Sequence, residues 1–373
     1  MRRFALLALS ATIATFLLIV LGGVVRTMGA GLACPDWPLC HGALIPPLEG
    51  LVLVEYGHRL VASIVGVLAL AVVVAAWRRG AYRAHSALAA VLVAVQIVLG
   101  GLTVRTELTP AFVVAHLGTA MAFFAALVSL TARAWLHDVR PVRTACARLL
   151  AIAAVAVFGL ILLGGTVSAT AAGLACPDWP LCYGQLAPTL SGRTGIHVAH
   201  RLAAAAVGLL ILLSAACAHR LRPARPDLQA GTAVAVGLLV LQVLLGALNV
   251  EYRLAPGVVV SHLATAAALF GLLVLLAVMA SHSAPVPVPS GSAPAGDALR
   301  ARRLLAYVAL TKPRIIVLLL ITALASMLIA APGTVSPWII LFTLAGGAAS
   351  AGAANAINQV LDRDIDAMMA RTR

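Results

Sequence analysis

The decapeptide Gly-Leu-Ala-Cys-Pro-Asp-Trp-Pro-Leu-Cys occupies residues 31–40 and recurs without a change at residues 173–182. Ten identical residues indicate an internal duplication, which decides the fold before any single helix is placed. The offset of 142 residues also relates His58-Arg59-Leu60 to His200-Arg201-Leu202, and further along an offset of 146 relates Gln96 to Gln242 and His116 to His262. We therefore predict two copies of one unit, up to about residue 280.

The composition is that of a membrane protein. The chain of 373 residues is 62% hydrophobic and 10% charged, with a mean hydropathy of +1.05. Runs of roughly 20 apolar residues are long enough to span a bilayer, and only helices of that length satisfy their own backbone there. The sequence predicts an all-α polytopic membrane protein, with two tandem four-helix transmembrane bundles followed by two further transmembrane helices. The predicted spans lie near residues 5–25, 57–77, 86–104, 111–132, 149–168, 197–217, 230–249, 257–280, 315–332 and 336–357.

The net charge of +14 reflects arginines gathered at alternate ends of these spans and does not indicate nucleic-acid binding. By the positive-inside rule these ends face the cytoplasm, so the N-terminus is predicted to be cytoplasmic and both decapeptides to lie outside. We expect a multi-pass protein of a bacterial inner membrane, in contact with its lipids. The clusters are Arg2 and Arg3; Arg78, Arg79 and Arg83; Arg133, Arg140, Arg143 and Arg148; Arg220, Arg222 and Arg225; and Arg300, Arg302, Arg303, Lys312 and Arg314.

The predicted organisation has four parts. Residues 1–140 and 141–280 are the two repeats, which lie the same way up because each contains an even number of helices. Residues 281–298 are rich in Pro, Ser and Ala and are predicted to be a linker. Residues 299–373 have no copy of the decapeptide and are predicted to start a different domain.

Each decapeptide contributes a pair of cysteines, Cys34 with Cys40 and Cys176 with Cys182. The outer side of a bacterial inner membrane is oxidising, so a structural disulfide in each loop is the leading prediction. A redox-active pair is the main alternative. A metal site is disfavoured because the spacing is not Cys-x2-Cys and His41, the histidine beside the first loop, is not repeated.

Two histidines recur in each copy, namely His58 and His116 in the first and His200 and His262 in the second. A polar imidazole within a span is costly and usually faces the interior of the bundle. Two facing imidazoles at one depth can take both axial positions of a haem iron, so we predict one bis-histidine haem site per copy. Zinc fits less well, because it needs four ligands and no acid or thiolate repeats at that depth.

The two copies differ three residues before the first histidine, where Glu55 in one corresponds to His197 in the other. On a helix Glu55 shares a face with His58, so its carboxylate is predicted to lie against the haem edge, where it can hold a proton or stabilise a developing cation. The first copy is therefore the predicted reactive site, and the second a structural or electron-relay site. Arg59 and Arg201 are predicted either to pair with haem propionates or to extend to the membrane interface.

Together, the Glu55-to-Arg59 run, the four histidines, the outward cysteine pairs and the duplicated unit resemble haem A synthase over residues 1–280. The resemblance implies an oxidoreductase that converts the C8 methyl group of haem O to the formyl group of haem A, for terminal oxidases. It implies that His58 and His116 flank the substrate haem, that His200 and His262 ligate a permanent haem b, and that Glu55 is the catalytic carboxylate. Cys34 and Cys40 would be the functionally linked pair, and oxidase assembly factors are expected partners.

The segment after the linker resembles protohaem IX farnesyltransferase, the UbiA-type prenyltransferase that makes haem O. The resemblance rests on Leu310-Thr311-Lys312-Pro313-Arg314-Ile315 and on Asn358, Asp362 and Asp366. Oxygen ligands repeated every four residues lie on one helix face, where they can hold Mg²⁺ against a prenyl diphosphate. The chain ends before the family's second aspartate motif, so we expect an incomplete transferase appended to the oxidoreductase.

Two other functions are compatible with parts of this pattern. A non-catalytic di-haem cytochrome b would explain the four histidines equally well but needs no role for Glu55. A quinone-linked disulfide oxidase would use the cysteine pairs but leaves the intramembrane histidines unexplained.

Overall fold

The computed structural model describes residues 1–185, 188, 190–221, 224–283, 311–330 and 336–361. Within them the chain is helical, which confirms the predicted all-α polytopic fold, and extended pairing is limited to isolated bridges. The helices are α1 (Arg2–Thr27), α2 (Gly50–Arg79), α3 (Arg83–Arg105), α4 (Pro110–Trp135), α5 (Ala145–Ala169), α6 (Gly192–Arg220), α7 (Pro226–Glu251), α8 (Pro256–Ala280), α10 (Pro313–Ala330) and α11 (Pro337–Leu361). Among the described residues, nine helices are long and apolar enough to cross a membrane, and α10 contains the shorter apolar stretch Ile315–Leu324.

The second helix of each repeat begins earlier than hydropathy predicts. We expected helix entry near residues 57 and 197, but α2 begins at Gly50 and α6 at Gly192. The first turns of α6 carry the polar residues Arg193, Thr194 and His197, which lower the hydropathy, whereas residues 50–54 at the start of α2 are apolar. Glu55 and His197 each contact the backbone of the preceding loop from within the helix. As a result, Glu55 and His58 lie well within α2.

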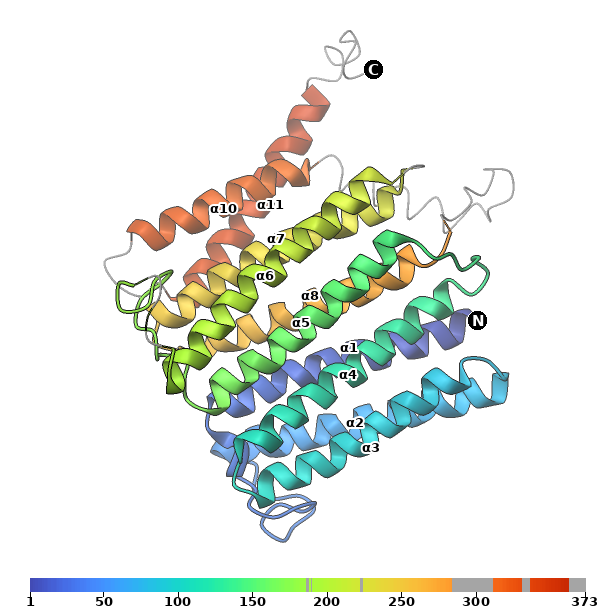
Figure 1. Cartoon of the computed structure of the whole chain (residues 1–373), viewed down its shortest axis with the longest axis vertical. Coiled ribbons are helices and arrows are strands. Elements are labelled where there is room, and N and C mark those ends of the chain that lie inside the picture. The colour runs from blue at the N-terminus through green and yellow to red at the C-terminus, as the bar shows by residue number, and fades with distance from the viewer. Residues whose placement is uncertain (186–187, 189, 222–223, 284–310, 331–335, 362–373) are drawn as a thin grey trace. The chain divides into compact units, whose positions relative to one another are not determined.

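The eight helices before the linker form two bundles of four. In the first, α1 packs on α2 and α4 while α3 closes the ring, and α5 to α8 repeat this arrangement. The bundles meet through α1, α4, α5 and α8, so that the pairs α2/α3 and α6/α7 lie on the outside (Figure 1). Buried side chains of the inner helices, among them Ile19, Phe124, Val157 and Phe270, fill the core between the bundles.

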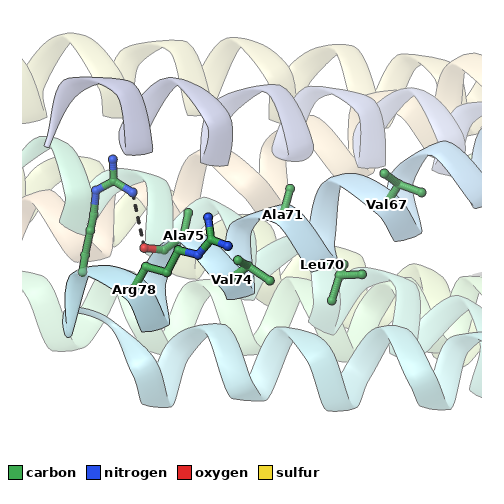
Figure 2. Close-up of a pocket in the computed structure, with 7 residues that line it drawn as sticks. Val67, Leu70, Ala71, Val74, Ala75 and Arg78 are labelled. Atoms are coloured by element: carbon green, nitrogen blue, oxygen red, sulfur yellow. Dashed lines mark hydrogen bonds between the residues drawn. The ribbon is translucent and has the colours of Figure 1, made fainter.

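The outer helices expose large apolar side chains, as expected of a surface that faces lipid. On α2 a shallow groove is lined by Val67, Leu70 and Val74 and ends at Arg78 and Arg79 (Figure 2). The Arg79 guanidinium donates a hydrogen bond to the carbonyl of Ala75 at 3.3 Å. Apolar side chains followed by arginines fit a helix that leaves the hydrocarbon region at its arginine-bearing end, and the chain is a multi-pass membrane protein.

Residues 286–373 form a second compact unit, separate from residues 1–285. Its described part contains α10 and α11. The side-chain amide of Asn355 on α11 donates a hydrogen bond to the carbonyl of Thr311 at 3.0 Å, which fixes the turn that precedes α10. Most of the predicted linker lies outside the described residues.

Candidate functional site

The four repeated histidines lie in equivalent places on α2, α4, α6 and α8. In each of the four imidazoles the Nδ1 atom is buried without a hydrogen-bond partner. The four histidines are His58, His116, His200 and His262. A buried polar atom without a partner is unusual and needs an explanation, such as a ligand. Recurrence of the same feature at all four positions points to one kind of ligand in both bundles.

Each imidazole packs against a glycine of the preceding helix. A Cβ at Gly22 would lie 3.3 Å from Cε1 of His58, and one at Gly100 would lie 3.3 Å from Cε1 of His116. The second bundle repeats this arrangement: a Cβ at Gly164 would lie 3.1 Å from Cε1 of His200, and one at Gly246 would lie 3.4 Å from Cε1 of His262. The glycines therefore leave room for the rings between neighbouring helices.

Two glutamines contact the histidines of the fourth helices. The amide nitrogen of Gln96 lies 3.1 Å from Nε2 of His116, and that of Gln242 lies 3.2 Å from Nε2 of His262. Our site prediction omitted these glutamines and the four glycines. The signal was present in the sequence, because all of them recur at the offsets of the duplication.

The two histidines within a bundle face a common region. They lie on the second and fourth helices of the same four-helix bundle, and each packs against a glycine of the helix before it. Paired imidazoles with unpartnered nitrogens, glycine clearance beside each ring and apolar walls are the features that a bis-histidine haem site requires. The residues present therefore fit the predicted cofactor.

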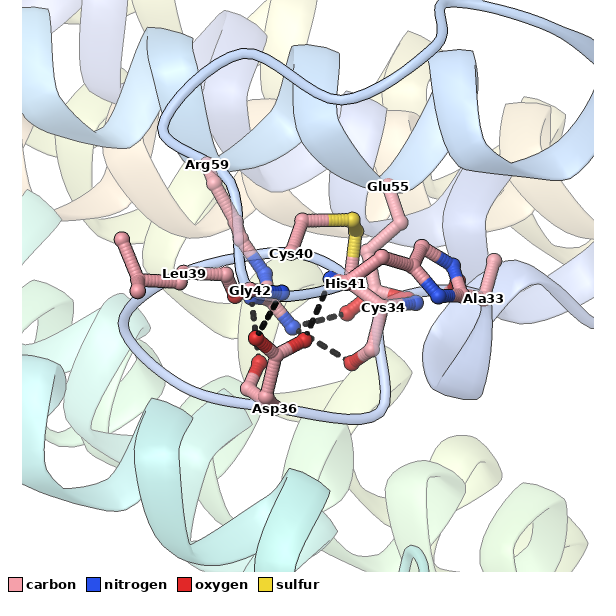
Figure 3. Close-up of a disulfide and its surroundings, with 9 residues drawn as sticks. All are labelled: Ala33, Cys34, Asp36, Leu39, Cys40, His41, Gly42, Glu55 and Arg59. Atoms are coloured by element: carbon pink, nitrogen blue, oxygen red, sulfur yellow. Dashed lines mark hydrogen bonds and ion pairs between the residues drawn. A yellow bond between two sulfur atoms is a disulfide. The ribbon is translucent and has the colours of Figure 1, made fainter.

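Each decapeptide folds into a disulfide-closed loop above its bundle. Cys34 is bonded to Cys40 and Cys176 to Cys182, each pair with a Cα–Cα separation of 4.7 Å. In the first loop the Asp36 carboxylate accepts hydrogen bonds from the backbone N–H groups of His41 at 2.6 Å and Gly42 at 2.7 Å (Figure 3). In the second loop Asp178 accepts the same bonds from Tyr183 and Gly184.

Glu55 joins the first loop to the helix that carries His58. Its side chain is only 4% exposed, and Oε2 accepts a hydrogen bond from the backbone N–H of Cys34 at 2.8 Å. Oε1 forms an ion pair with Arg59 at 2.6 Å, and Arg59 also donates to the carbonyls of Cys34, Asp36 and Leu39 (Figure 3). The carboxylate position is thus fixed by the half-cystine itself and by an arginine that binds the same loop.

The second loop uses different side chains for the same contact. The backbone N–H of Cys176 donates to Nδ1 of His197 at 3.3 Å, so this histidine takes the place of Glu55. Arg201 donates through Nη1 to the carbonyl of Leu181 at 2.6 Å. Its Nη2 is buried without a partner, because the carboxylate that would bind it is missing.

The Asp36 contacts predict a pH-dependent loop. Hydrogen bonds from the backbone N–H groups of Gly42 and His41 lower the pKa of Asp36 below its usual value. A lowered native pKa means that the stabilisation is present above the unfolded value and is lost as pH falls through the native value. We expect Cys34–Cys40 to resist reduction by a phosphine in mild acid and to lose this protection only as pH falls below the usual pKa of an aspartate.

The matched variants for this prediction are Asp36→Asn and Asp178→Asn. In Asp36→Asn one loop N–H loses its acceptor, so the Cys34–Cys40 bond should be reduced faster than in the wild type even at neutral pH. Asp178→Asn should affect only Cys176–Cys182. Thiol trapping followed by mass spectrometry distinguishes the two bonds, and an unchanged rate for Asp36→Asn would contradict the prediction.

The remaining predicted site residues lie in the second unit. Asn358 lies on α11 and is exposed, whereas Asp362 and Asp366 lie outside the described residues. Across the described residues, no three His, Cys, Asp or Glu side chains are grouped so that they could hold a metal ion.

A duplicated helical bundle in the membrane, with buried histidine pairs suited to haem, defines a class of haem-dependent membrane oxidoreductase. The chain matches the cytochrome oxidase assembly protein family, COX15-CtaA, over residues 5–50, 49–156, 147–194 and 192–327, and it belongs to that family. It is 31% identical over 308 residues to a haem A synthase of Geobacillus kaustophilus, an alignment that covers 78% of this chain and 95% of the relative. A haem A synthase of Symbiobacterium thermophilum is 32% identical over 263 residues, which cover 66% of this chain and 86% of the relative. The chain is thus an oxidoreductase that serves haem A synthesis.

The C-terminal segment is similar to a second group of proteins. Residues 319–373 match the UbiA prenyltransferase family. A protohaem IX farnesyltransferase of Thermus thermophilus is 32% identical over an alignment of 382 residues, which covers 95% of this chain and 62% of the relative. One from Haloarcula marismortui is 38% identical over 251 residues, covering 60% of this chain and 52% of the relative. The chain thus spans between half and two thirds of the length of these two farnesyltransferase relatives.

Proposed function

We propose that this chain is a haem A synthase that oxidises the C8 methyl group of haem O to a formyl group. The first bundle holds haem O between His58 and His116, and the second holds a resident haem b between His200 and His262. The observation that carries this assignment is the difference between otherwise equivalent bundles. A buried carboxylate, Glu55, occupies the first, and His197 takes its place in the second.

In the proposed reaction Glu55 is the catalytic carboxylate. A bound haem supplies redox-active iron, and the protein supplies a charged group fixed beside it. The hydrogen bond from Cys34 and the ion pair with Arg59 restrict the carboxylate to one position. A carboxylate held in this way can accept a proton from the reacting carbon or stabilise positive charge that develops there.

The loop of the first half is proposed to position Glu55. Closing the Cys34–Cys40 ring brings the Cys34 N–H and three loop carbonyls onto the Glu55–Arg59 pair. Arg59 already uses both terminal nitrogens on this network, so its role is positioning. Arg201 retains a buried donor without a partner, and we assign it to a propionate of the resident haem.

The appended segment is proposed to belong to a haem O synthase, which transfers a farnesyl group to protohaem. Asn358, Asp362 and Asp366 would hold Mg²⁺ against the prenyl diphosphate. The product of this transferase is the substrate of the first unit, which gives the linkage a chemical rationale. The alignment with the Thermus relative, which extends over nearly all of this chain, supports the combination. The remaining proposed setting is a bacterial inner membrane, with the N-terminus cytoplasmic and both cysteine loops outside, in contact with oxidase assembly factors.

The test is pigment analysis of membranes that express this chain together with a source of haem O. Haem A should appear in the extracted haems, and a variant with both His58 and His116 replaced by alanine should instead accumulate haem O. A wild-type chain that binds haem and yields only haem O would contradict the proposal and favour an electron carrier.

A further inference from the structure

Two pairs of adjacent glycines connect the histidine sites of the two bundles. Gly22 and Gly23 lie on α1, and Gly164 and Gly165 occupy the equivalent places on α5. The first glycine of each pair faces the histidine of its own bundle, as described above. The second glycine faces the other bundle: a Cβ at Gly23 would lie 2.8 Å from Leu263, and one at Gly165 would lie 2.8 Å from Leu117.

These leucines are the residues directly after the histidines of the fourth helices. Leu117 follows His116, and Leu263 follows His262. Two symmetric sets of neighbouring residues result, in which each glycine pair lies between a histidine of its own bundle and a leucine of the other bundle. One set runs from His58 through Gly22, Gly23 and Leu263 to His262, and the other from His200 through Gly164, Gly165 and Leu117 to His116.

The contacts at Gly23 and Gly165 leave no room for a side chain unless the facing leucine shifts. A Cβ at 2.8 Å from a methyl carbon is closer than real contacts allow, so the leucine or the helix would have to move. Glycine within a helix is unfavourable relative to alanine, so its presence here is explained by the close approach of the bundles. One turn further on, Arg26 of α1 donates to the carbonyl of Ser168 of α5 at 2.9 Å and joins the same two helices.

We propose that Gly23 and Gly165 are positioning residues that set the separation of the two haem sites and, through that separation, the rate of electron exchange between them. The inference rests on the proposed function, because it takes each histidine pair to hold a haem. In the exchange, iron(II) in one bundle is oxidised to iron(III) while iron(III) in the other is reduced to iron(II). No proton and no further reactant is needed.

The experiment compares Gly165→Val with Gly159→Val in the purified full-length chain loaded with haem. Both glycines lie on α5, but a Cβ at Gly159 meets nothing within 4 Å, so the second variant controls for valine in this helix. Haem content is measured from the pyridine haemochrome spectrum. Electron exchange is followed optically after rapid photoreduction, with the two haems distinguished by their midpoint potentials.

We expect Gly165→Val to lose the fast exchange phase while it retains both haems, and Gly159→Val to behave as the wild type does. Adding Leu117→Ala to Gly165→Val should restore the phase, because the shorter side chain makes room for the valine. If Gly165→Val alone loses haem, the exchange rate of this double variant tests the proposal instead. Exchange as fast in Gly165→Val as in the wild type, with both haems bound, would overturn the inference.

Haem A formation by the wild-type chain is measured in parallel, so that two kinds of failure can be told apart. If haem A forms and the glycine variants exchange electrons normally, only the inference about the spacing of the bundles fails. If the wild-type histidine pairs bind no haem, the proposed function fails and the inference fails with it.

Discussion

Replacing Glu55 by glutamine is expected to lower haem A formation by about 10²- to 10⁴-fold, the range that a positioned acid or base contributes to a rate. Glutamine keeps an oxygen that can accept the hydrogen bond from Cys34, so the loop should stay in place. It cannot carry the negative charge that the proposed chemistry needs. Haem A and haem O extracted from membranes and separated by chromatography give the rate, and the haem bound to the purified variant should remain at the wild-type level.

Glutamine is a better probe than alanine at this position. Glu55→Ala would leave the Cys34 N–H without its acceptor and Arg59 without its carboxylate, although Arg59 would keep its bonds to the loop carbonyls. A loss of activity in the alanine variant could then reflect a displaced loop. The glutamine variant changes the charge with little change in shape.

The second bundle provides the matched control. His197→Gln alters the residue that contacts Cys176 in the same way as Glu55 contacts Cys34, but in the half without the reactive carboxylate. We expect haem A formation to fall far less than in Glu55→Gln. If Glu55→Gln makes haem A as fast as the wild type does, then Glu55 only anchors the loop, and the di-haem electron carrier becomes the better account.

Much of this site could be predicted from the repeated sequence. Apolar runs of roughly 20 residues mark the membrane helices. The identical decapeptide aligns the two copies of the repeat, and this alignment identifies the histidines that recur in both. Glu55 was identified because it breaks the repeat, at the place where the second copy has His197.

The contacts of the loop could not be predicted in this way. We expected Arg59 either to reach a propionate or to extend to the interface, whereas it donates to three loop carbonyls and to Glu55. Every residue has a backbone carbonyl, so the sequence does not show which carbonyls an arginine will bind. Arg59 could therefore not be told from an arginine that is free to bind a propionate. The start of α2 was missed for a related reason: Glu55 interrupts the apolar run that begins at Gly50, and its contacts with Arg59 and with the Cys34 N–H cannot be read from the sequence.

The glycines were missed because a glycine has no chemistry of its own. Its function is the space that it leaves, and this becomes visible only when the neighbouring ring is placed. The duplication nevertheless gave a usable signal, since Gly22 and Gly164 recur at the same offset as the histidines they face. A position where two diverged copies both keep glycine inside a helix is therefore a reasonable candidate for close packing.

His262→Ala is expected to remove the resident haem from the purified chain, whereas His116→Ala should leave it in place. The reason is that the two rings occupy equivalent positions in different bundles, and only the second bundle is proposed to keep its haem through purification.

A milder change is Gln242→Leu, which removes the amide nitrogen that lies 3.2 Å from Nε2 of His262. Residues that support a metal ligand typically contribute about 10- to 100-fold to affinity. Gln242→Leu should therefore weaken haem binding by about that factor, and His262→Ala should weaken it by more.

The measurement is the haem-to-protein ratio after purification, followed by titration of the haem-free protein with ferric haem. Gln96→Leu is the matched control in the first bundle and should leave the resident haem unchanged while it weakens binding of added haem O. Equal loss of resident haem in His116→Ala and His262→Ala would contradict the division of labour between the halves. It would mean that both bundles hold haem equally well. The Glu55 carboxylate would then be the feature that distinguishes the reactive half, because haem occupancy would be the same in both.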